Sequence, residues 1–173
     1  LVGSILYFHP QFSDIRTLTY LPFVADETLD YNVLRHFVTG IDLGWLIYIP
    51  VVVFILTALS NAVNLTDGLD GLAAGVTGIV ALGLTALAYI AGNAIFADFL
   101  NEMLLPGAGE LTIFSASLAA SCFGFLWYNG YPASVFMGDT GALSLGAAVG
   151  TMALMVKKEL LLPLLCAISF LET

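Results

Sequence analysis

Residues 61–75 of the chain read NAVNLTDGLDGLAAG, and they separate two long apolar runs. This first polar island holds two amides, one hydroxyl, two carboxylates and three glycines. A second polar island, FMGDTG at residues 136–141, follows later between two further apolar runs. In so apolar a chain, two such groups of polar side chains are the natural candidates for chemistry.

The composition indicates an integral membrane protein. Of the 173 residues, 60% are hydrophobic and only 10% are charged, whereas about 25% of the residues of a soluble domain are charged. The formal net charge of −9 argues against a nucleic-acid partner, which requires a basic surface. Cys122 and Cys166 lie inside apolar runs, so we expect both to pack as small hydrophobic side chains without binding a metal.

Hydropathy divides the chain into spans of about 20 residues. We expect one all-α membrane domain, residues 1–173, with complete transmembrane helices at 43–60, 71–92, 111–128 and 140–156. Residues 1–8 are interpreted as the end of a preceding span and residues 160–173 as a truncated span. The chain is therefore interpreted as an internal piece of a longer membrane protein.

Two polar loops connect these spans. The loop at 9–42 contains an alternating stretch, TLTYL at 17–21, which predicts a short β-hairpin. The loop at 93–110 carries acidic residues that we expect in water, on a short amphipathic helix. His9 and His36 lack metal-ligand spacing and are interpreted as loop residues.

Counting spans puts both islands on one side of the membrane, because each span crosses once. The two loops and the Lys157-Lys158 pair then lie on the other side. All four basic residues are on that other side, so the positive-inside rule alone would put the islands outside the cell. Four charges are too few to decide the orientation.

The carboxylates of Asp67, Asp70 and Asp139 are oxygen ligands of the kind that Mg²⁺ prefers. If they converge, they could hold an ion that offsets the charge of a pyrophosphate. Asn61 and Asn64 are three residues apart and would share one helical face, where they suit a sugar, a base or the surroundings of a metal. The glycines of both islands would let backbone N–H groups approach a phosphate; they are Gly68, Gly71, Gly138 and Gly141.

Simpler interpretations stay open at this point. Thr66, Asp67 or Asp70 could cap the following helix, and Asp139 could do the same in the second island. Phe136 could be a packing residue. One cap accounts for only one of the five polar side chains between 61 and 70. A third alternative is an ion-coupled transporter that uses the carboxylates as a cation relay, although no internal repeat supports it.

The two islands resemble the signatures of the phospho-N-acetylmuramoyl-pentapeptide transferase family. The first match is NAVNLTDGLDGLA at 61–73, and the second is YPA at 131–133 followed by VFMGDTG at 135–141. The wider superfamily transfers hexosamine phosphates to polyprenyl phosphate. Its N-acetylglucosamine-1-phosphate transferases tend to read DGIDG and GDAG, so the spelling here favours the muramoyl-pentapeptide branch, with the hexosamine branch as the alternative.

The resemblance implies ten transmembrane helices, a possible homodimer, dependence on Mg²⁺ and an active site on the cytoplasmic face of the bacterial inner membrane. It implies transfer of phospho-MurNAc-pentapeptide from UDP to undecaprenyl phosphate, which gives lipid I and UMP in peptidoglycan synthesis. About five of the ten helices are covered. The family's Asp-Asp pair and histidine cluster have no counterpart in these 173 residues, so we expect the chain alone to be inactive.

The resemblance also implies roles for individual residues. Asp67, Asp70 and Asp139 match the catalytic acids. Asp139 looks like the principal Mg²⁺ ligand, with Asn64 beside it, and Asp70 would lie near the uracil. The implied substrate-binding residues are Asn61, Asn64, Asp70, Phe136, which would stack on the uracil, and Gly138.

Overall fold

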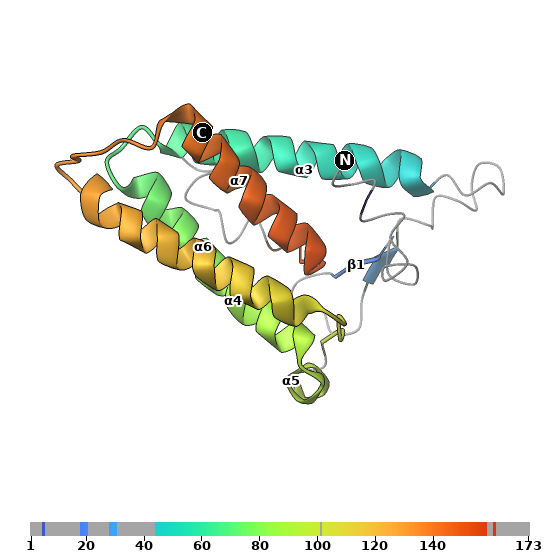
Figure 1. The fold of residues 1–173 in the computed structure, drawn as a ribbon. Helices are drawn as coiled ribbons and strands as arrows, with labels where there is room; N and C mark the ends of the chain where they lie inside the picture. The colour runs from blue at the N-terminus through green and yellow to red at the C-terminus, as the bar shows by residue number, and fades with distance from the viewer. Residues whose placement is uncertain are drawn as a thin grey trace.

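The computed structural model describes residue 5 and residues 18–20, 28–30, 44–100, 102–158 and 161. Two short strands precede a group of helices (Figure 1). Strands β1 (Leu18–Tyr20) and β2 (Thr28–Asp30) pair antiparallel, with Leu18 opposite Asp30. The predicted hairpin in the loop at 9–42 is therefore confirmed. His9, His36, Cys166 and the expected spans at 1–8 and 160–173 lie outside the described residues, apart from Ile5 and Leu161.

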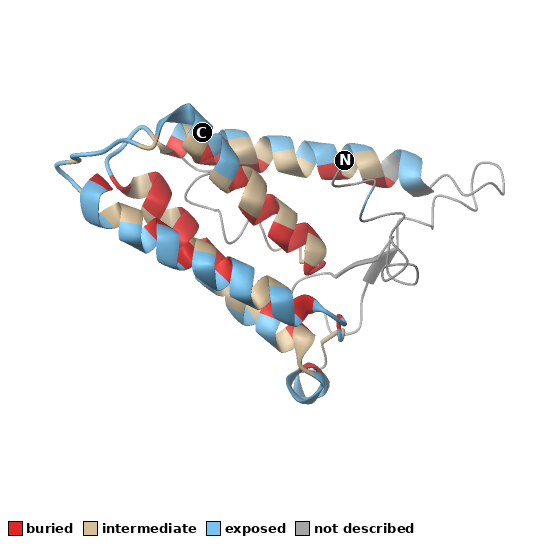
Figure 2. Ribbon diagram, in the orientation of Figure 1, coloured by how far each residue is buried: buried red, intermediate tan, exposed pale blue. Residues whose placement is uncertain are grey.

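The helices fall into two packed pairs. They are α3 (Gly44–Thr66), α4 (Leu72–Gly92), the short α5 (Ala94–Phe99), α6 (Ala108–Asn129) and α7 (Gly138–Met155). Helix α4 packs mainly against α6, and α3 mainly against α7 (Figure 1). The buried residues lie where helices meet, while the outward faces are exposed (Figure 2).

Three of these helices are long and apolar enough to cross a membrane: Tyr48–Thr66 within α3, α4 and α6. The expectation of a helical, membrane-spanning fold is confirmed. Helix α7, where a fourth span was expected, is not among the three, and its first turn carries Asp139.

Helix α3 runs six residues past the boundary that hydropathy gave it, through Asn61 and Asn64 to Thr66. Hydropathy detects apolar side chains, but a helix continues through polar ones until a residue breaks it. The turn at Asp67 and Gly68 ends α3. Helix α6 likewise begins at Ala108, directly after Gly107, whose φ is +88°.

Glycines allow the helices of each pair to approach closely. A Cβ on Gly146 of α7 would lie 2.6 Å from the carbonyl oxygen of Leu59 in α3, and Gly150 touches the same helix. A Cβ on Gly78 would lie 3.3 Å from Cys122 of α6, which is itself buried. Such close approaches are typical of small residues where membrane helices pack, and the expected packing role of Cys122 is confirmed.

A shared apolar core joins three helices. Leu59 of α3, Leu84 of α4 and Met152 of α7 belong to one buried cluster. Within the α3–α7 pair, the Ser60 hydroxyl also donates to the Leu143 carbonyl at 2.7 Å, whereas Leu84 connects this pair to α4. The two pairs therefore form one body, and the chain crosses between them at residues 67–71 and again at residues 130–137.

Candidate active site

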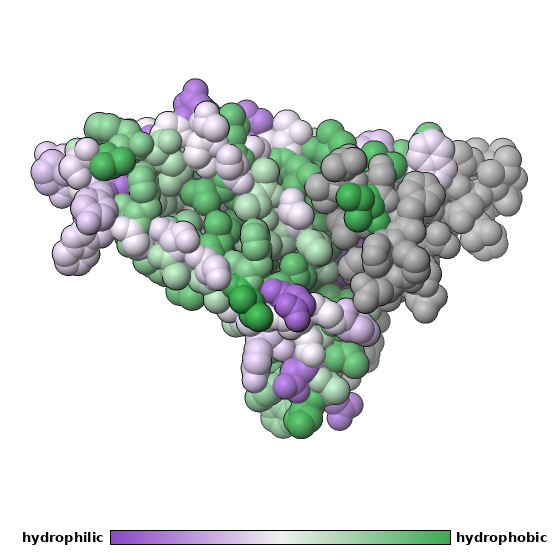
Figure 3. Space-filling view, in the orientation of Figure 1, coloured by the Kyte–Doolittle hydropathy of each residue, from purple (hydrophilic) through white to green (hydrophobic). Residues whose placement is uncertain are grey.

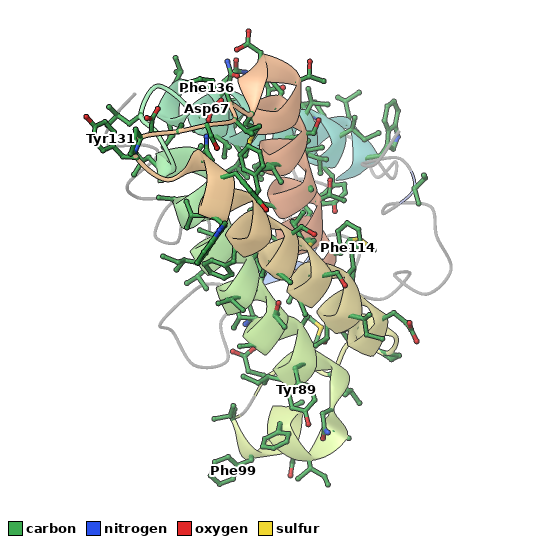
Figure 4. The ribbon with its side chains drawn as sticks, turned by 60° about the vertical axis from the view of Figure 1, so that its left-hand side comes forward. Asp67, Tyr89, Phe99, Phe114, Tyr131 and Phe136 are labelled. Carbon is green, nitrogen blue, oxygen red and sulfur yellow. The ribbon has the colours of Figure 1, made fainter. Side chains whose placement is uncertain are left out.

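The two islands meet at one end of the helical bundle. The first lies where α3 passes into α4, and the second where α6 passes into α7. Asp67, Tyr131 and Phe136 lie at this end, and Tyr89 and Phe99 lie at the other (Figure 4). The prediction that both islands share one side is confirmed by the direct contacts described next.

The Asn129 side chain joins the two crossings. It ends α6 and is only 3% exposed. Its Oδ1 accepts a hydrogen bond from the Gly71 N–H at 3.1 Å, and its Nδ2 donates to the Val135 carbonyl at 2.9 Å. Asn129 was not among the candidates drawn from the sequence. An amide at the end of an apolar run, shortly before the second polar island, is the sequence signal that could have identified Asn129.

Asp70 makes a second link between the crossings. Its Oδ2 accepts a hydrogen bond from the Ala133 N–H at 3.0 Å. Gly71 follows with a φ of +76°, and a Cβ there would lie 3.0 Å from Leu126 and 3.4 Å from the Asn129 carbonyl oxygen. Only glycine combines this conformation with so close an approach of α4 to the end of α6.

Asp67 faces Asp139 from the other island. The pKa of Asp67 is raised above its ordinary value, first because the carboxyl is partly buried and second because the Asp139 carboxylate is near. A hydrogen bond from the Gly138 backbone opposes both effects. Asp139 lies in the first turn of α7, where the helix dipole favours negative charge. Two mutually repelling carboxylates favour the binding of a cation between them.

The three carboxylates do not form one cluster. Among the described residues, no group of three His, Cys, Asp or Glu side chains could hold a metal ion. Asp67 and Asp70 lie in a turn and not on one helical face, so one faces Asp139 and the other bonds to Ala133. The expected convergence of all three carboxylates is therefore replaced by a pair.

The two asparagines occupy the last turns of α3. Asn61 is exposed and donates to the Thr57 carbonyl at 2.7 Å. The Oδ1 of Asn64 is buried, and it has no hydrogen-bond partner among the described residues. Buried acceptors in native proteins nearly always have a partner. This oxygen is therefore suited to a ligand.

The structure does not support the interpretation of the island side chains as caps of the helices that follow them. The N-cap residues of α4 and α7 are Gly71 and Met137, and neither has a side-chain capping bond. The Thr66 hydroxyl instead donates back to the Ala62 carbonyl at 2.8 Å within α3. The polar side chains of the islands are thus not needed to start the helices that follow them.

Phe136 is not a packing residue, because 73% of it is exposed. Met137 fills that role, lying against Gly141, where a Cβ would come within 2.5 Å of the methionine Cγ. Gly138 has a φ of +70° and open space on the side where a Cβ would stand. An exposed aromatic ring and an open glycine therefore lie next to Asp139, where a flat ligand could stack.

Apolar helices of spanning length and an acidic polar site at their joined ends define a multi-pass membrane protein. Residues 15–157 match the model of glycosyl transferase family 4, and the chain belongs to that family.

Its relatives carry one name. The chain is 67% identical over 171 residues to the phospho-N-acetylmuramoyl-pentapeptide-transferase of Salinibacter ruber, covering 99% of this chain and 44% of the relative. Proteins of the same name from Chlorobium phaeobacteroides and Chloroherpeton thalassium are each 51% identical, over 99% and 100% of this chain and 43% and 44% of their own lengths. The chain spans less than half the length of these curated relatives. The resemblance drawn from the two islands is confirmed.

Proposed function

We propose that the chain is part of an enzyme that transfers phospho-MurNAc-pentapeptide from UDP-MurNAc-pentapeptide to undecaprenyl phosphate, giving lipid I and UMP. The observation that carries this proposal is the joining of the two islands by the Asn129–Gly71 and Asp70–Ala133 hydrogen bonds, which brings Asp67 and Asp139 within electrostatic reach of each other. A phosphoryl transfer between two phosphates brings several negative charges together. It depends on positioning and on offsetting that charge, and a carboxylate pair that favours a cation serves both needs.

In the proposed reaction, an oxygen of the lipid phosphate attacks the β-phosphorus of the UDP-sugar. The new P–O bond forms as the bond to the α-phosphate oxygen breaks, and UMP leaves. The lipid phosphate lies at the membrane boundary, and the islands lie at the end of α3, the start of α4 and the end of α6. The islands at these helix ends can therefore meet a lipid-bound and a water-soluble substrate at the same depth.

Mg²⁺ is the proposed cofactor, and Asp139 and Asn64 would hold it. When bound, it supplies positive charge to the pyrophosphate. Asp67 would add negative charge beside the ion, since its carboxyl interacts electrostatically with that of Asp139. The exposed start of α7 offers backbone N–H groups to a phosphate oxygen.

The nucleotide would bind beside this site. Phe136 offers an exposed face for uracil, and Gly138 leaves room beside it. The Ala133 N–H fixes one oxygen of Asp70, so the other oxygen is held in a defined direction and can accept a hydrogen bond from the base. Asn61 and Asn64 would complete the pocket from the α3 side.

The proposed location is the bacterial inner membrane, with both islands facing the cytoplasm. UDP-sugars are cytoplasmic, and this outweighs the small charge count that favours the opposite orientation. A homodimer is proposed from the resemblance alone. Residues 1–173 by themselves are proposed to be inactive, because the Asp-Asp pair and the histidine cluster of the resembling family are not among them.

The test is UMP release by the intact enzyme in the presence of undecaprenyl phosphate. UDP-MurNAc-pentapeptide should be turned over and UDP-GlcNAc should not. Turnover of UDP-GlcNAc alone would assign the enzyme to the hexosamine branch. Ion flux across vesicles without any UMP would identify a transporter and remove the proposal.

A further inference from the structure

Helix α5 exposes large apolar side chains at the end of the molecule away from the site. Ile95 is 79% exposed and Phe99 is 82% exposed, and both lie within a helix of six residues. Phe96 and Leu100 are also exposed. Figure 3 shows hydrophobic atoms at the lower tip, where α5 lies, next to polar ones. Such a patch on a folded protein marks a surface that has a partner.

The exposure of α5 is built into the fold. The Oδ1 of Asn93 caps the helix, accepting from the Ile95 N–H at 3.0 Å. Ala97 is buried at 2% exposure, and its carbonyl accepts from the Glu102 N–H at 2.8 Å. Glu102 in turn forms an ion pair with Lys158, beyond the end of α7. These bonds fix α5 to the bundle and hold its apolar residues outward.

The exposed surface of α5 continues a stripe on α4. Ile79, Leu82 and Tyr89 are 66%, 49% and 51% exposed, and their spacing of three and seven residues puts them on one helical face. Helix α4 is one of the membrane-spanning candidates. The Tyr89 ring contacts the Phe96 ring, with the centroids 5.7 Å apart. The apolar surface of α4 is therefore linked to α5 through this ring pair.

We propose that α5 lies in the lipid boundary on the membrane face opposite the candidate active site, with Ile95 and Phe99 inserted among the lipids. A short helix with an apolar face stably occupies this depth when its polar groups reach the water. Asp98 is exposed on α5 and can do so. The charges on this segment are acidic, so attraction to anionic headgroups is not the cause. The partner is the apolar part of the bilayer, and this inference is independent of the proposed function.

Spin labels at single cysteines test this placement. The intact protein would carry Ala at Cys122 and Cys166 and a labelled cysteine at Ile95, Phe99, Asp98 or Ile79. After reconstitution in phosphatidylcholine vesicles, collision rates are measured with oxygen, which concentrates in lipid, and with nickel-EDDA, which stays in water. Ile79, near the middle of α4, supplies the lipid reference, and Asp98 is the matched control, one residue from Phe99.

We expect labels at 95 and 99 to collide more often with oxygen than with nickel-EDDA. Their ratio of oxygen to nickel-EDDA collisions should be smaller than that of the label at 79. The label at 98 should collide more often with nickel-EDDA than with oxygen. Frequent nickel-EDDA collisions at 95 and 99 would mean that water covers them and would overturn the proposal. Low collision rates with both reagents would mean that protein covers the labels at 95 and 99. An oxygen excess at 98 equal to that at 99 would mean that the whole of α5 is immersed in lipid. Either result would also overturn it.

Discussion

Asn129→Ala tests the link between the two crossings. The substitution removes both side-chain hydrogen bonds, to the Gly71 N–H and to the Val135 carbonyl. Gly71 is buried, and a buried donor without an acceptor costs about 1–3 kcal/mol. Val135 is exposed, so its carbonyl regains a bond to water and adds little. We expect the free energy of unfolding to fall by about 1–3 kcal/mol, and Tm in detergent to fall by several degrees.

Activity should fall as well, because the freed loop precedes Phe136 and Asp139. A displacement of about 1 Å at such a site can cost up to about 10²-fold in rate. UMP release and thermal unfolding are measured on the same preparations. The control is Ser134→Ala in the same loop. It removes an exposed hydrogen bond from the Ser134 hydroxyl to the Tyr128 carbonyl, while the Ser134 backbone N–H keeps its own bond to that carbonyl. It should change stability by less than about 0.5 kcal/mol. Equal effects of the two substitutions would refute the linking role of Asn129.

Substitutions at Asp139, Gly146, Gly124 and Gly138 test the site and the packing. Asp139→Asn should lower UMP release by on the order of 10²-fold, as loss of a key electrostatic group does; near-normal release would remove Asp139 from the site. Gly146→Ala should destabilise by about 1–3 kcal/mol, because its Cβ would collide with the backbone of Leu59. Gly124 lies in the interior of α6, and a Cβ there would meet nothing within 4 Å. Gly124→Ala should therefore raise the free energy of unfolding by about 0.5–1 kcal/mol. If thermal unfolding gives the two glycine variants the same sign, the close crossing of α3 and α7 is wrong. Gly138→Ala should lower Tm more than Gly138→Asn, because asparagine tolerates the positive φ better than alanine.

The sequence predicted the features that depend on neighbouring residues. Runs of apolar side chains located the helices, and the alternation at 17–21 located the hairpin. Counting crossings put Asp67 and Asp139 on one side, because a span has only two ends.

What it did not predict depends on contacts between distant residues or on the path of the backbone. Asn129 bonds to a residue 58 positions away, and nothing near it in the sequence indicates that partner. Asp67 and Asp70 looked equivalent, but the turn between them sends them to different neighbours. The end of α3 was misplaced because hydropathy reports side-chain polarity, whereas the helix ends where the backbone turns.

The arrangement of the helices in two pairs has a mechanical consequence. The chain passes between the pairs at residues 67–71 and 130–137, and these two crossings carry Asp67, Asp70 and Phe136. The Asn129–Gly71 and Asp70–Ala133 hydrogen bonds tie these two crossings to each other, so a tilt of one pair against the other would have to strain them. In the proposed enzyme, a substrate that touched both crossings would resist the same tilt. Filling the site would then also stiffen the bundle.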